Sequence, residues 1–109
     1  MERHKFVYVA GPYTQGDPVL NVRAAVAAAD ELLNLGLVPF VPHLSHLWHT
    51  ISPKPYDAWI RLDLYWLRKC DALLRLPGPS HGADAEVAYA VDLGIPVYYS
   101  VAEVVRDAE

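Results

Sequence analysis

The sequence has little cysteine, no cluster of basic residues and no long apolar run. Cys70 is the only cysteine among 109 residues, which excludes an internal disulfide and favours a reducing compartment. The nine Lys and Arg residues are scattered among thirteen Asp and Glu, for a net charge of −4, so we expect no nucleic-acid polymer as a partner. No segment approaches the about 20 apolar residues of a membrane span, and no secretory signal is visible. These absences predict a cytoplasmic protein without a membrane partner.

The remaining composition predicts one globular domain over residues 1–109. Hydrophobic residues make up 53% of the chain and charged residues 20%, which is typical of folded proteins. A chain of this length buries one core and leaves little room for a second lobe.

Apolar patterning predicts strands and helices in alternation. Strands are expected at residues 5–10, 37–41, 71–76 and 95–99, and helices at residues 19–35, 56–70, 83–93 and 101–108. Asp17 and Pro18 have the composition of a helix N-cap followed by proline at the first helical position. Apolar residues of the first helix recur at Val22, Val26, Ala29 and Leu33. Pro39 predicts an edge position for the second strand, because proline cannot donate to a ladder.

This alternation predicts an α/β fold, a single Rossmann-like (flavodoxin-like) domain. We expect a parallel four-stranded sheet of order 2-1-3-4 with helices on both faces. Ligands of such sheets bind outside the carboxyl ends of the strands, where the strand order reverses. The turn-rich segments 11–17 and 77–82 would meet there. Residues 42–55 are expected to be an irregular segment, and long loops of this kind are usually functional.

An aspartate interrupts a helical stripe that is otherwise apolar. The stripe consists of Trp59, Asp63, Trp66 and Cys70, spaced by four, three and four residues. A buried carboxylate has to be paired, protonated or directed at a cavity. Asp63 therefore either forms an ion pair, with Arg23, Arg61 or Arg68 as the available partners, or belongs to a functional site.

A glutamate takes a similar place in the next helix. Glu86 aligns with Ala90 and Leu93 and follows the loop 77–82. A glutamate in a first turn is often no more than a complement to the helix dipole. Two carboxylates at one pocket, however, suit chemistry at an acetal-like carbon, where one stabilises or attacks the carbon and the other protonates the leaving group.

Three motifs resemble those of nucleoside 2-deoxyribosyltransferases and the related 2'-deoxynucleoside 5'-phosphate N-hydrolases. The first strand and loop contain Tyr8-Val-Ala-Gly-Pro12. A catalytic aspartate eight residues before a second aspartate is matched by Asp63-Leu-Tyr-Trp-Leu-Arg-Lys-Cys-Asp71. A catalytic glutamate six residues after a substrate-binding Ser or Asp is matched by Ser80-His-Gly-Ala-Asp-Ala-Glu86. The chain is similar above all to a group of short bacterial and phage proteins near that family.

The resemblance implies roles for these residues at an N-glycosidic bond. Glu86 would be the nucleophile on the anomeric carbon or its stabiliser, and Asp63 would donate a proton to the nucleobase. Tyr8 would lie near the sugar and Glu86. Ser80 and backbone groups around Gly82 would hold a 5'-phosphate or a 5'-hydroxyl. Serine, where the transferases carry aspartate, favours a 5'-monophosphate over a nucleoside, because an aspartate would repel phosphate.

The first loop and the histidine-containing segment supply the other expected binding residues. These are Gly11, Pro12, Tyr13, Thr14 and His43. Pro12 stands where the hydrolases have a phosphate-binding serine, for which Thr14 would substitute. His43, with His46 and Trp48, would line a base pocket or cover the sheet.

The resemblance and the composition also bear on partners and alternatives. We expect a small-molecule nucleoside or nucleotide as the ligand, no cofactor and no metal. Family members complete the site from a neighbouring subunit, and a thin aromatic-rich sheet leaves apolar surface to cover, so a homo-oligomer is expected. A non-catalytic nucleotide-binding or sensing module is the alternative function. Zinc bound by the histidine segment is a third possibility.

Overall fold

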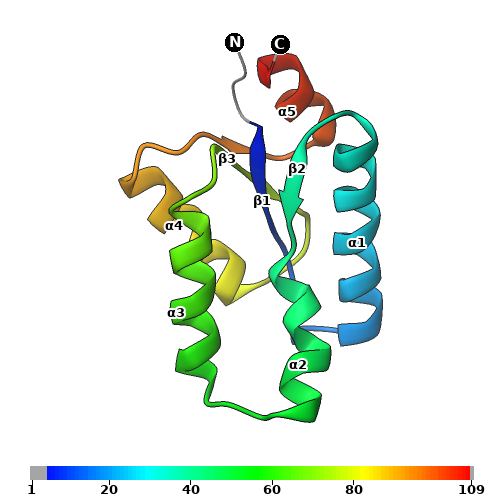
Figure 1. Ribbon diagram of the computed structural model, residues 1–109, viewed down its shortest axis with the longest axis vertical. Helices are drawn as coiled ribbons and strands as arrows, with labels where there is room; N and C mark the ends of the chain where they lie inside the picture. The colour runs from blue at the N-terminus through cyan, green and yellow to red at the C-terminus, as the bar shows by residue number, and fades with distance from the viewer. Residues whose placement is uncertain (1–4, 109) are drawn as a thin grey trace.

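Four parallel strands form one sheet in the order β2-β1-β3-β4 in the computed structural model, which describes residues 5–108 (Figure 1). The strands are β1 (Phe6–Ala10), β2 (Val38–Phe40), β3 (Ala72–Arg75) and β4 (Val97–Tyr98). β1 pairs in parallel with β2 and with β3, and β3 pairs with β4. The predicted strand order is confirmed, and Pro39 lies on the edge strand β2 as expected.

Helices cover both faces of this sheet, as predicted. They are α1 (Pro18–Asn34), α2 (Ser45–Ile51), α3 (Tyr56–Leu67), α4 (His81–Asp92) and α5 (Val101–Ala108), with a 3-10 turn, η1, at Pro42–Leu44. Val7 and Val9 belong to a core cluster shared with α1 and α5. Tyr8 and Ala10, which point to the opposite face, belong to a cluster shared with α3 and α4. Among residues 5–108, no helix is long and apolar enough to cross a membrane.

Helix α1 begins as predicted but buries a different stripe. The Asp17 side chain accepts hydrogen bonds from the amides at the helix start, and proline follows it. The buried residues are Ala25, Ala29 and Leu32, whereas Val26 and Leu33 are exposed, so the predicted stripe was wrong at those two positions. Small alanines let the helix lie close to the sheet, which branched side chains at the same positions would prevent.

The segment 42–55 is not irregular throughout, which corrects the sequence-based prediction. It contains η1 and the seven-residue helix α2. The helix and the residue before it carry an apolar stripe with exposed fractions of 51–75%; its members are Leu44, Leu47, Trp48 and Ile51. This spacing is typical of an amphipathic helix, but the stripe faces away from the core. In Figure 1, α2 and the first half of α3 extend below the carboxyl ends of the strands.

Candidate active site

A cavity of about 530 Å³ lies at the carboxyl end of the sheet, between the loops after β1 and β3, the α2 segment and α3. Eight of the residues expected from the sequence line it; they are Gly11, Tyr13, Thr14, His43, Asp63, Ser80, Gly82 and Glu86. Tyr8 and Pro12 do not line it. The two carboxylates of separate helices, α3 and α4, therefore face one space.

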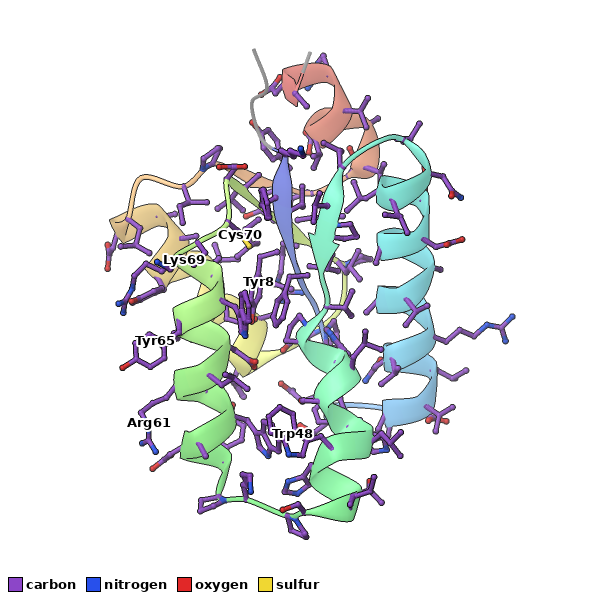
Figure 2. All side chains as sticks on the ribbon, in the orientation of Figure 1. Tyr8, Trp48, Arg61, Tyr65, Lys69 and Cys70 are labelled. Atoms are coloured by element: carbon purple, nitrogen blue, oxygen red, sulfur yellow. The ribbon has the colours of Figure 1, made fainter. Side chains whose placement is uncertain are left out.

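Glu86 is buried in the second turn of α4 and is held by Tyr8. The Tyr8 hydroxyl donates a hydrogen bond of 2.5 Å to Oε2 of Glu86. Burial raises the pKa of Glu86 to about 7, although the Tyr8 hydrogen bond and the Arg75 charge both lower it. Tyr8 itself is fully buried between β1 and α3 (Figure 2), and burial and the Glu86 charge raise the pKa of its hydroxyl far above neutral. Tyr8 thus remains a donor, which leaves Oε1 of Glu86 for the cavity.

Asp63 has no arginine partner among the residues that the structure describes. Arg61 points outward from α3 (Figure 2), and Arg68 donates to the Tyr89 hydroxyl at 2.8 Å. No hydrogen bond or ion pair joins the Asp63 carboxyl to any residue in 5–108. Burial, followed by the charge of Glu86, raises the pKa of Asp63 to about 7. The ion-pair interpretation of this aspartate therefore finds no support in the structure.

The rest of the Asp63 stripe differs from the prediction. Trp66, expected in the core, is 49% exposed and stacks on Phe40 at the edge strand, with ring centroids 5.2 Å apart. Cys70 is buried but lies beyond the last residue of α3.

The surroundings of the two carboxyls distribute their protons unequally. Glu86 has a hydrogen-bond donor in Tyr8 and a nearby cation in Arg75, which stabilise its charged form. Asp63 has neither, and the Glu86 charge opposes its ionisation. When two like charges share a low-dielectric site, the better-stabilised group ionises first. These partners favour ionisation of Glu86 and retention of the proton by Asp63.

The loop after β3 is fastened by Arg75. Its guanidinium donates to the carbonyls of Leu76 and Gly78 and pairs with Asp84 at 2.8 Å. Gly78 has φ +112°, and a Cβ there would lie 2.9 Å from the Pro12 ring, so the two loops pack closely. Pro12 therefore contributes to loop packing outside the cavity.

Ser80 caps helix α4, and the backbone amide of the following residue donates a hydrogen bond to a side chain of the first loop. The Ser80 hydroxyl oxygen accepts from the Ala83 amide at 3.0 Å. The amide of His81 donates to Oε1 of Gln15 at 2.9 Å. Gln15 thus bridges the two loops that the strand order brings together at the cavity.

His43 is fixed below the first loop. Its Nε2 lies 2.9 Å from the Pro12 carbonyl and 3.2 Å from that of Gly11. Since both carbonyls can only accept, Nε2 carries the hydrogen. Burial lowers the pKa of the ring. The other residues expected near a base pocket lie outside the cavity lining: His46 contacts the Tyr13 hydroxyl, and Trp48 packs edge-on against Trp59 at 5.1 Å.

Sequence reasoning missed several lining residues, of which the polar or aromatic ones are Gln15, Ser45, His49, Lys54, Tyr56, Trp59 and His81. Ser45, His49 and Lys54 belong to the segment 42–55, part of which is helical against expectation, whereas Tyr56 and Trp59 lie on the predicted helix. The histidine spacing was the available signal, but it was weighed only for metal binding and base stacking. Within residues 5–108, no group of three or more His, Cys, Asp or Glu side chains is placed to hold a metal ion.

The two raised carboxyl pKa values make the stability of the fold depend on pH. A group with a higher pKa in the folded state contributes stability that is complete below its unfolded pKa and is lost as pH rises through the folded pKa. For Asp63 that window runs from about 4 to about 7. When the pH is raised from 4 to 8, wild type loses this contribution and Asp63→Asn does not. The free energy of unfolding of the variant minus that of wild type should therefore increase by about 1 kcal/mol or more.

Urea denaturation at both pH values measures this gain. Asp30→Asn, an exposed substitution on α1, serves as the matched control and should show almost no pH-dependent difference. If the free energies of unfolding of Asp63→Asn and wild type differ by the same amount at both pH values, the prediction of a raised pKa for Asp63 is wrong.

Comparison with known structures defines the class of this fold. A 2-deoxyribosyltransferase from the psychrotolerant bacterium Bacillus psychrosaccharolyticus superposes with a TM-score of 0.61 and 20% identity, over 84% of this chain and 69% of that one. A 2-deoxyribosyltransferase from Leishmania mexicana superposes with a TM-score of 0.64 and 22% identity, over 85% of this chain and 61% of that one. The chain therefore has the 2-deoxyribosyltransferase fold and spans roughly two thirds of the length of those proteins.

The sequence comparisons place the chain in a family. The model of a domain of unknown function (DUF7768) matches residues 5–100. The chain belongs to this family. No curated protein matches it significantly.

Proposed function

We propose that the protein cleaves the N-glycosidic bond of a nucleoside or a nucleoside 5'-monophosphate at this cavity and transfers the sugar to water or to a second base. The observation that carries the proposal is the pair of carboxyls from α3 and α4 that face one cavity with unequal support for their charges. The fold shared with two 2-deoxyribosyltransferases supports the same chemistry.

The proposed reaction begins with departure of the base. Glu86 Oε1 approaches the anomeric carbon and stabilises it or bonds to it, while the bond from that carbon to the base nitrogen breaks. The proton of Asp63 passes to the base, which leaves neutral. Water, or the ring nitrogen of a second base, then bonds to the same carbon while the bond to Glu86 breaks or its stabilising contact ends, and the proton lost by the attacking group returns to the Asp63 carboxylate. Tyr8 is a positioning residue in this scheme, since it holds Oε2 of Glu86.

The 5' end of the sugar would bind near the start of α4. Ser80 and Gly82 line the cavity there, and amides at a helix start favour an anion. The Lys54 ammonium and the His81 ring belong to the same lining. These residues support a 5'-monophosphate as one of the two substrate classes.

A screen for base release tests the proposal. The protein is incubated with ribo- and 2'-deoxyribonucleosides and with their 5'-monophosphates, each with and without a second base, and the free base is separated by chromatography. We expect release from at least one substrate above a protein-free background. No release from any substrate, together with a substrate-dependent rise in melting temperature, would replace the enzyme with the binding-module alternative.

A further inference from the structure

One histidine on the cavity wall is held in a single tautomer. Nδ1 of His49 accepts hydrogen bonds from the Lys54 amide at 3.2 Å and from Nε1 of Trp59 at 2.8 Å. A backbone amide and an indole can only donate, so Nδ1 carries a lone pair and the hydrogen is on Nε2.

The Nε2–H of His49 is unused within the described chain. His49 lines the cavity, and no residue in 5–108 accepts a hydrogen bond from its Nε2. Among residues 5–108, Nδ1 of His43 is the side-chain nitrogen or oxygen that is both buried and without a partner. Nε2 of His49 also lacks a partner but is not buried, so it is open to solvent or ligand. A free donor on a cavity wall is a recognition group for an acceptor atom.

The residue that holds this donor lies on the same helix as Asp63. Trp59, which holds His49, precedes Asp63 by four residues on the same helix face, or about 6 Å along the axis. The ring of Trp59 packs edge-on against His49 and Trp48, with centroids 5.8 Å and 5.1 Å away. His49 is therefore held by a residue one helical turn before Asp63, and both side chains line the same cavity.

We propose that Nε2–H of His49 donates to a carbonyl oxygen of the nucleobase and so selects oxo-bases over amino-bases. The inference rests on the proposed function and deepens it. An exocyclic amino group at that position would place two donors face to face, which costs the hydrogen bond and leaves both groups desolvated. With the donor facing C6 of a purine or C4 of a pyrimidine, hypoxanthine and uracil offer a carbonyl oxygen there, whereas adenine and cytosine carry an amino group at the same position.

Two substitutions separate the donor from the packing role of the ring. In His49→Asn, the short amide retains an oxygen for the Trp59 indole but loses the group that reaches the cavity. In His49→Gln, the longer amide carries an N–H at about the position of Nε2. Isothermal titration with the free bases hypoxanthine, adenine, uracil and cytosine measures the preference without requiring turnover.

We expect wild type to bind the oxo-base more tightly in at least one of the two pairs, purine or pyrimidine. His49→Asn should lower that preference about tenfold, and His49→Gln should restore most of it, with melting temperatures close to wild type. Equal binding within both pairs, or an unchanged preference in His49→Asn, would overturn the role of His49 while any base release leaves the proposed function standing. If no base binds and no base is released, both fail.

Discussion

Replacing Glu86 with glutamine is expected to lower base release about 10³-fold or more, because an amide is a poor nucleophile and carries no charge to stabilise the anomeric carbon. The fold should survive, since the amide oxygen of the substituted side chain can still accept from Tyr8. The loss should appear in kcat, with little change in the affinity for substrate.

Initial rates of the purified variant on the best substrate of the screen measure this loss. Glu31→Gln, an exposed substitution on α1, is the matched control and should retain wild-type turnover. If Glu86→Gln turns over within a few-fold of wild type, the carboxylate is not part of the reaction.

Replacing Asp63 with asparagine is expected to slow base release about 10²–10⁴-fold, the usual contribution of a positioned proton donor. The pKa of Asp63, raised to about 7 by burial and by Glu86, places loss of its proton within the working range. The wild-type rate should therefore fall as pH rises above about 7. The asparagine variant should lack this decline.

A substrate whose base leaves without a proton provides the sharpest check on Asp63. The base of a 7-methylguanine nucleoside is already cationic, so its release should depend far less on the substitution. Asp57→Asn, exposed in the first turn of the same helix, is the control. If Asp63→Asn slows the release of a neutral base and of 7-methylguanine by the same factor, Asp63 is not the proton donor.

The sheet could be predicted because its signals are local. Alternating strands and helices allow few topologies, and Pro39 excluded a central place for β2. The Asp17 cap and the proline after it marked the start of α1 correctly. β4 is shorter than expected, two residues instead of five, because Pro96 supplies only a carbonyl to the ladder, which the Leu73 amide uses.

The site was only partly predictable, because its contacts join distant residues. Asp63 and Glu86 could be found from the sequence, since each places a charge in an apolar stripe. The contact between Tyr8 and Glu86 spans 78 positions, and residue patterning alone gives no sign of it. The wall formed by α2 was missed because Pro42 and Pro53 on either side indicated an irregular segment, although the apolar residues between them have helical spacing.

The contact between Gln15 and the His81 amide influences which ligands gain from binding at the start of α4. That amide is one of the groups that would otherwise attract an anion. A phosphate that uses it has to release the Gln15 carboxamide, so its net affinity is reduced by the free energy of the displaced hydrogen bond. A sugar with a plain hydroxyl leaves the loops joined and bears no such cost. The uncharged glutamine would thus compete with a phosphate for this amide, and the strength of its hydrogen bond would set how far a phosphorylated ligand is preferred over an unphosphorylated one.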